Sequence, residues 1–195
     1  MNKLVIAAAC AVVVTGAQAD GGNYALDPTH TFVTFEVTHF GTSTNRARFD
    51  KKEGMVQFDR AARTGRVEIT IDMASINSGV PPFDGHLRSK DILNVSEFPT
   101  AKFVGDKFSF SGDKVTAVAG TLTMMGQTHP VTLKANRFNC YLNPMFKREV
   151  CGGDFETVIQ RSQWGVNYGL PAVAPDNVRL VVQVEAVKQY GGFCG

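Results

Sequence analysis

The chain has 195 residues, which is enough for one domain with a sizeable hydrophobic core. Its 20 lysines and arginines almost balance its 18 aspartates and glutamates, and a formal net charge of +2 gives no electrostatic basis for binding nucleic acid. Its aromatic residues include 14 phenylalanines and one tryptophan, which favours an interior of apolar rings without polar atoms.

Residues 1–19 have the pattern of a secretory signal peptide. Lys3 precedes an apolar run from Leu4 to Val14, and Ala17-Gln18-Ala19 fits a cleavage site of small residues. The apolar run is shorter than the roughly 20 residues that a membrane-spanning helix needs. We therefore expect an exported protein with one folded domain over residues 20–188.

The first predicted strand covers residues 31–39. Val33, Phe35, Val37 and His39 alternate there with polar residues, so the four side chains share one face. At the rim of a cavity His39 could hydrogen-bond a ligand, although a histidine satisfied within the core is the more frequent case. The following segment, GTSTNRARF, carries Arg46 and Arg48 and is interpreted as a loop.

Alternation of apolar and polar residues predicts strands along most of the remaining chain. The clearest are residues 66–76, with Ile69 and Ile71 on the apolar face, and residues 178–188, with Val182 on that face. Weaker alternation predicts strands over residues 54–59, 101–112, 114–126, 129–138 and 155–161. Such strands pair antiparallel around one interior, and the pattern leaves a sandwich and a closed barrel both open.

One helix is predicted, beginning at Pro81 and Pro82 and running for about three turns. Phe83 and Leu87 share a face, which Ile92 or Leu93 continues, and Asp84 is placed to pair with Arg88. We expect this helix to lie across one end of the barrel with its apolar face down. Whether His86 or Arg88 turns inward is left open.

Three cysteines follow the predicted signal peptide. In an oxidising compartment Cys140 and Cys151 are the natural disulfide pair, because Asn143-Pro144 between them can turn the chain back. Cys194 is then unpaired, and a free thiol or an intermolecular link in a homodimer are both open. It lies in residues 189–195, which are predicted to be a flexible tail.

Motifs for catalysis or metal binding are not found. The sequence has no Gly-x-Ser-x-Gly motif and no phosphate-binding glycine motif, and its four histidines do not have metal-ligand spacing. His30 and His129 are expected to hydrogen-bond to the backbone near strand starts. If Arg46, Arg48, Arg88 and Arg161 converged at one mouth of a barrel, they would suit an anionic or carbonyl-bearing head group.

An ordered set of segments resembles the YceI-like family of polyisoprenoid-binding proteins. The set is YALDPTHTFVTFEVTHFGTS, GMVQFD, ITIDMASINS, HLRSKDILNVSEFPTAKF, AGTLTMMGQTHPVTL and IQRSQWGV. The resemblance extends from Tyr24 to about Val187, and the segment CYLNPMFKREVCGGDF is similar to that of a cysteine-containing branch. Two departures are Ala47, where the family commonly has glycine, and Trp164, where it usually has phenylalanine.

The resemblance implies an all-β, lipocalin-like antiparallel barrel of about eight strands in the periplasm of a Gram-negative bacterium. It implies a non-catalytic carrier of ubiquinone or a polyprenyl pyrophosphate, with no metal or other cofactor, and a cytochrome b561-type membrane protein as a partner. The residues expected to line the lipid tail are Val33, Phe35, Val37, Ile69, Ile71, Phe103, Phe108 and Val182. Those expected at the head group are His39, Arg46, Arg48, His86, Arg88 and Arg161.

A different class of function is kept as the alternative. In it, the protein is an enzyme or a metal-dependent protein that acts on a lipid-like substrate through His39 and His86. A third possibility is a closed structural barrel that binds only partner proteins.

Overall fold

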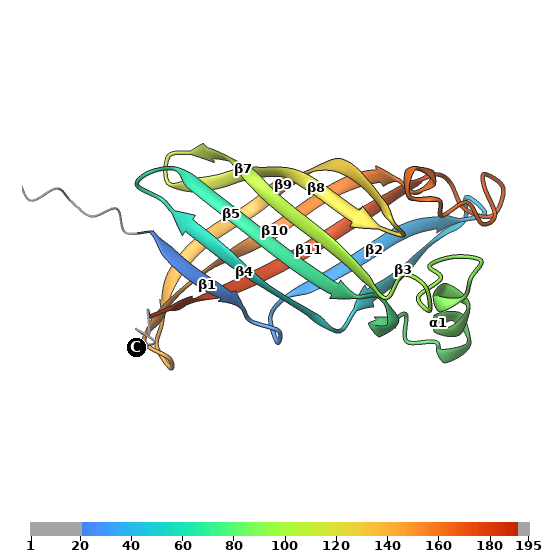
Figure 1. The fold of residues 1–195 in the computed structure, drawn as a ribbon, viewed down its shortest axis with the longest axis horizontal. Coiled ribbons are helices and arrows are strands. Elements are labelled where there is room, and N and C mark those ends of the chain that lie inside the picture. The colour runs from blue at the N-terminus through green and yellow to red at the C-terminus, as the bar shows by residue number, and fades with distance from the viewer. Residues whose placement is uncertain (1–20, 191–195) are drawn as a thin grey trace, which may run out of the picture.

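The computed structural model describes residues 21–190, which form a closed antiparallel β-barrel with a short helix at one end (Figure 1). The helix is α1 (Pro81–Arg88), and two 3-10 turns are η1 (Met73–Ser75) and η2 (Arg161–Trp164). The predicted signal peptide and residues 191–195 lie outside the described residues. The strands are β1 (Gly22–Leu26), β2 (Phe32–His39), β3 (Ser43–Phe49), β4 (Lys52–Asp59), β5 (Thr64–Asp72), β6 (Ile76–Asn77), β7 (Thr100–Ser111), β8 (Lys114–Met124), β9 (Gln127–Asn143), β10 (Arg148–Gln160) and β11 (Asn177–Gln189).

Within residues 21–190 a ring of strands in the order β1-β4-β5-β7-β8-β9-β10-β11 closes when β11 pairs with β1. This confirms the antiparallel barrel of about eight strands that the resemblance implied, and it excludes the sandwich. Farther along its length β11 pairs with β2, so β2, β3 and β6 extend the wall at the helix end.

The sequence prediction for residues 43–49 was wrong. This segment is β3, which pairs antiparallel with β2. The pairing runs from Val33 opposite Phe49 to His39 opposite Ser43. Ala47 and Phe49 are buried, while Arg46 and Arg48 point to solvent from the other face of the strand. The alternation was hard to recognise because only Phe49 on the inner face is strongly apolar. The short strand β1 was likewise not predicted.

The end of the barrel near β1 is filled by aromatic side chains. The ring of Phe58 stacks on Phe110 at 6.1 Å between centroids and meets the edge of Phe138 at 5.6 Å. Tyr24 is buried beside them, and its hydroxyl donates a hydrogen bond of 2.5 Å to Glu149. These contacts close the barrel at the end opposite the helix.

α1 is shorter than predicted. It ends at Arg88 because Ser89 leaves helical geometry and donates to the His86 carbonyl from both its backbone N–H and its hydroxyl, at 3.1 and 2.7 Å. Ile92 and Leu93 follow in turns and still pack against the core. No helix within residues 21–190 has the length and apolar character to cross a membrane.

Asp84 does not form the predicted ion pair with Arg88. Its Oδ1 atom instead accepts hydrogen bonds from the backbone N–H and the hydroxyl of Ser78, at 2.7 and 2.5 Å. These hydrogen bonds lower the pKa of the Asp84 carboxyl below its usual value, and Arg88 adds only a longer-range Coulomb interaction. Asp84 therefore ties the start of α1 to the segment that follows β6.

Cys140 and Cys151 form a disulfide, as predicted, from directly opposite positions on β9 and β10. Replacing both with serine is expected to lower the free energy of unfolding by about 2–3 kcal/mol, because the bond closes a loop with a sequence separation of 11. Urea titration of both forms measures the difference. An unchanged midpoint would contradict this expectation.

Asp27, between β1 and β2, has a strongly perturbed pKa. Burial raises it, but hydrogen bonds from the Thr29 hydroxyl, His30 and the Thr29 N–H outweigh burial and bring the pKa to about 2. Because this value lies below that of an unfolded chain, the carboxylate stabilises the fold above about pH 4, and this contribution is lost as pH falls through about 2.

Asp27→Asn is therefore expected to lower the free energy of unfolding by about 1 kcal/mol at pH 7, after allowance for solvent screening. The difference from the unsubstituted protein should shrink as the pH falls below about 4 towards the pKa of Asp27 at about 2. Urea unfolding over a pH series measures it, and a penalty that stays constant down to the lowest pH would show that the charge of Asp27 is not its cause.

Candidate functional site

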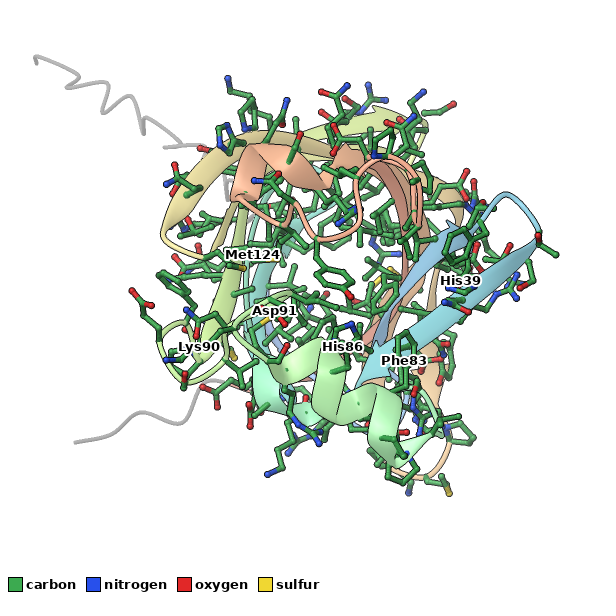
Figure 2. The ribbon with its side chains drawn as sticks, turned by 90° about the vertical axis from the view of Figure 1, so that its right-hand side faces the viewer. His39, Phe83, His86, Lys90, Asp91 and Met124 are labelled. Carbon is green, nitrogen blue, oxygen red and sulfur yellow. A yellow bond between two sulfur atoms is a disulfide. The ribbon has the colours of Figure 1, made fainter. Side chains whose placement is uncertain are left out.

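The barrel encloses a cavity of about 420 Å³ at its helix end, here called the outer chamber. Its walls come from the inner faces of the strands, and its cover comes from α1, the turns after it and the segment 165–176 (Figure 2). The lining is mostly apolar and includes Phe35, Phe49, Leu87 and Leu180. A cavity of this kind suits an apolar ligand of moderate size.

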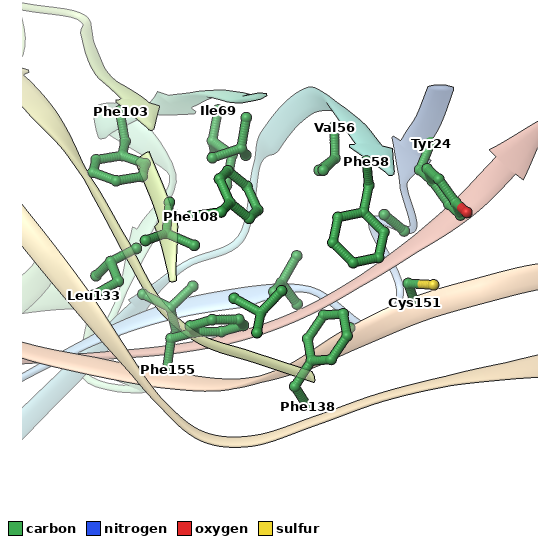
Figure 3. A pocket seen from close by; sticks show the side chains of 17 residues that line it. Tyr24, Val56, Phe58, Ile69, Phe103, Phe108, Leu133, Phe138, Cys151 and Phe155 are labelled. Carbon is green, nitrogen blue, oxygen red and sulfur yellow. The ribbon is translucent and has the colours of Figure 1, made fainter. Parts of the chain in front are cut away.

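A second cavity, the inner chamber, has about 70 Å³ and lies deeper, towards β1 (Figure 3). Its lining includes five phenylalanines, Phe58, Phe103, Phe108, Phe138 and Phe155. Cys151, which forms the disulfide with Cys140, is also part of the lining. The two chambers share no lining residue. The two chambers are therefore distinct cavities along the barrel.

The eight residues predicted to contact a lipid tail all face the interior, but they divide between the chambers. Val33, Phe35, Val37 and Ile71 line the outer chamber. Ile69, Phe103, Phe108 and Val182 line the inner chamber. The alternation correctly identified inward-facing side chains, because residues two apart on a strand share a face, and their role in binding stays a prediction.

Four polar side chains, here called the polar collar, are part of the lining of the outer chamber. It consists of His39 and Asn45 from the β2–β3 hairpin, His86 from α1 and Tyr168 from the segment 165–176. The rings of His86 and Tyr168 meet edge to face at 5.0 Å between centroids, which joins α1 to that segment. No described carboxylate lines the chamber, so these groups can offer hydrogen bonds but no negative charge.

Arg161 also lines the outer chamber, but its guanidinium is engaged with the backbone. Nε donates to the Pro175 carbonyl at 3.0 Å, Nη1 to Val166 at 2.9 Å and Nη2 to Ala174 at 3.0 Å. The side chain is 7% exposed, and this burial lowers the pKa of the guanidinium, with Asp176 partly offsetting the effect. Arg161 thus holds the segment 165–176 in place over the chamber.

The remaining arginines predicted at the head group do not line either chamber. Arg46 pairs with Glu36 at 2.8 Å, and Arg48 pairs with Asp50 at 2.7 Å, both on the outer surface. Arg88 is half-buried on α1 and also lies outside the lining. The predicted convergence of four arginines at one mouth is therefore wrong, because β3 is a strand whose even-numbered side chains face outward.

Asn45 and Tyr168 were missed by the sequence reasoning. Asn45 lies opposite Val37 in the β2–β3 pairing, so recognising β3 as a strand would have placed it on the inner face. Tyr168 lies in a segment without alternation that reaches the chamber because of the three Arg161 hydrogen bonds and a bond from the Phe40 N–H to the Val173 carbonyl. No local pattern in the sequence indicates such contacts.

The other two histidines have structural environments that differ from prediction. His30 Nδ1 pairs with the Asp27 carboxylate at 2.8 Å, not with the backbone. His129 packs against Trp164 at 5.0 Å between ring centroids, and its Nε2 has no hydrogen-bond partner among the described residues. Nowhere in residues 21–190 do three or more His, Cys, Asp or Glu side chains gather in a way that could hold a metal ion.

The fold and the two chambers define a lipocalin-like barrel of the kind that encloses an apolar small molecule. The chain belongs to the YceI-like family, whose domain profile matches residues 24–186. A UPF0312 protein of Shewanella denitrificans is 34% identical over 176 residues, covering 87% of this chain and 90% of that protein. One from Pseudomonas putida is 31% identical over 180 residues, covering 91% and 92%.

Solved structures share the fold. BcnA of Burkholderia cenocepacia superposes with a TM-score of 0.69 at 24% identity, covering 82% of this chain and 98% of that one. A polyisoprenoid binding domain from Saccharophagus degradans, implicated in plant cell wall breakdown, superposes with a TM-score of 0.61 at 16% identity, covering 85% and 98%.

Proposed function

We propose that this protein binds an isoprenoid lipid, with the tail in the outer chamber and the head group at the polar collar. The observation that carries the proposal is the mostly apolar chamber inside the barrel, whose lining includes the few polar side chains of the collar. Each buried CH₂-sized group contributes roughly 0.8 kcal/mol, so a tail of several isoprene units gains substantial affinity from such a wall alone. Binding of polyisoprenoids by a structural relative is consistent with this ligand class.

The ligand head is a neutral, carbonyl-bearing group such as a quinone, in preference to a pyrophosphate. A pyrophosphate needs several cationic donors, whereas the one arginine in the lining already donates to three backbone carbonyls. Arg46 and Arg48 lie outside and are paired with carboxylates. His39, Asn45 and Tyr168 offer the few hydrogen bonds that a neutral head requires.

Binding without catalysis is the better-supported activity. A histidine that acts as a general base is usually oriented by a carboxylate, and no described carboxylate lines the chamber with His39 and His86. The periplasm is the proposed location, because the Cys140–Cys151 disulfide fits an oxidising compartment.

Organic extraction of freshly purified protein, followed by mass spectrometry with metal analysis in parallel, tests the proposal. An isoprenoid lipid at near one equivalent is expected. Displacement of a fluorescent apolar probe then compares a long-chain quinone with a polyprenyl pyrophosphate of equal length, and the quinone should compete at lower concentration. Stoichiometric zinc without lipid would instead favour the metal-dependent alternative, and stronger competition by the pyrophosphate would overturn the head-group assignment.

A further inference from the structure

Large apolar side chains are exposed at the end of the barrel opposite the outer chamber. Leu142, Met145 and Phe146 lie at the tip of the β9–β10 hairpin and are 70%, 79% and 47% exposed. Tyr190, just after β11, is 65% exposed, and its hydroxyl donates to the Lys147 carbonyl at 3.1 Å. These four side chains are called the tip patch. The tip is the hairpin beside the C label in Figure 1.

The tip patch is held rigidly in its exposed position. β9 continues to Asn143, well past Ala117–Lys134, its last pair with β8, so β8 does not flank the hairpin end. Asn143 is buried, and its Oδ1 accepts hydrogen bonds from the N–H groups of Met145 and Phe146 at 2.9 and 3.2 Å. The Cys140–Cys151 disulfide joins the two strands just below. These hydrogen bonds fix the backbone of the turn, and a cluster of exposed apolar side chains on it indicates an interaction surface.

The charges around the tip patch are basic. Lys147 is exposed at the tip, and no carboxylate among the described residues lies within ion-pairing distance of it. The Arg148 guanidinium lies over the Tyr190 ring, 5.3 Å from its centroid. The neighbouring Glu149 is already engaged by Tyr24 and Arg60. The patch therefore combines apolar and aromatic side chains with basic groups, which is the chemistry of an anionic membrane interface.

A second copy of the chain is a poorer occupant. In a two-fold dimer that joins two tip patches, the same surface meets itself, so the basic groups of both copies would lie within one interface. Like charges brought together in this way weaken association. At a lipid surface, anionic head groups would instead pair with Lys147 and Arg148, and the apolar side chains of Leu142 and Met145 would insert among the lipids.

We propose that the tip patch binds this protein to anionic phospholipid membranes. A projecting hairpin tip with three apolar side chains suits insertion among lipid head groups, and the inference does not depend on the ligand of the outer chamber. Because the patch lies at the end opposite α1, the bound barrel holds the polar collar away from that membrane (Figure 1).

Vesicles of phosphatidylcholine, with and without phosphatidylglycerol, provide the test. The exported form is used, and mass spectrometry verifies its N-terminus. We expect binding to the anionic vesicles to fall at least tenfold in a Leu142→Gln/Met145→Gln variant, whose exposed positions should leave folding unchanged. Lys147→Gln should weaken the same binding by about fivefold and leave the weak binding to phosphatidylcholine unaltered.

Orientation is measured with a matched pair of tryptophan reporters. Phe146→Trp is at the tip patch, and Phe40→Trp is at the outer-chamber end, where Phe40 is 61% exposed. Brominated lipid should quench the first reporter and leave the second unaffected. Failure of the unsubstituted protein to bind anionic vesicles, quenching of the Phe40→Trp reporter, or a dimer that the Leu142→Gln/Met145→Gln change dissociates would each overturn the proposal.

Discussion

Replacing Leu180 with tryptophan is expected to abolish lipid binding while the barrel stays folded. Leu180 is half-buried on β11 and lines the outer chamber opposite Phe35 on β2. The larger indole would occupy space in the cavity of about 420 Å³, so the fold accommodates it at a cost of about 1–3 kcal/mol. Affinity for a long-chain quinone should fall at least about 100-fold, as measured by displacement of a fluorescent apolar probe.

Val158→Trp is the matched control for this prediction. Val158 lies on the neighbouring strand β10 and is 59% exposed on the outer surface, so the same substitution adds the same ring outside the cavity. Its affinity for the quinone should remain unchanged. Equal affinities in the two variants would mean that the ligand does not enter the outer chamber.

Replacing Arg161 with methionine is expected to lower the free energy of unfolding by about 3–5 kcal/mol. The change leaves the carbonyls of Val166, Ala174 and Pro175 without the donors that now satisfy them. Since the segment 165–176 carries Tyr168 into the polar collar, ligand affinity should fall as well. Urea unfolding and probe displacement measure the two effects.

Two further variants separate the role of Arg161 from that of its charge. Arg161→Lys keeps a positive charge but cannot reach three carbonyls from one ammonium group, so it should recover little stability. Arg179→Met removes an exposed arginine that pairs with Glu36 and Glu156. This substitution should lower the free energy of unfolding by less than about 1 kcal/mol. Full recovery by lysine would contradict the assigned role of the guanidinium.

Much of the barrel could be predicted from local sequence patterns. The alternation over residues 31–39 predicted β2, and that over residues 178–188 predicted β11, because each of these strands has one face in the core. β3 was missed because Asn45 and Ala47 weaken the apolar pattern on its inner face. Closure of the barrel could not be read from alternation, since a sandwich gives the same pattern, and it came from the family resemblance.

The candidate site was less predictable than the fold. His39 and His86 were expected near a ligand head, and the structure places both in the lining of the outer chamber. Arg161 was expected to present its guanidinium to the ligand. In the structure the guanidinium instead donates hydrogen bonds to the carbonyls of Pro175 and Ala174, which lie far from Arg161 along the chain. Such tertiary hydrogen bonds leave no local pattern, so residue type alone could not distinguish a binding group from a structural one.

β11 pairs with β10, β1 and β2, so the first two strands of the barrel have their partner in the last described strand. Until residues 177–189 are available, β1 and β2 cannot complete the wall, and the apolar inner faces of the earlier strands remain open to water. A contact pattern that joins distant parts of the chain slows folding. The chain therefore stays without a closed barrel until β11 has joined β1, β2 and β10, and the barrel becomes stable only at that step.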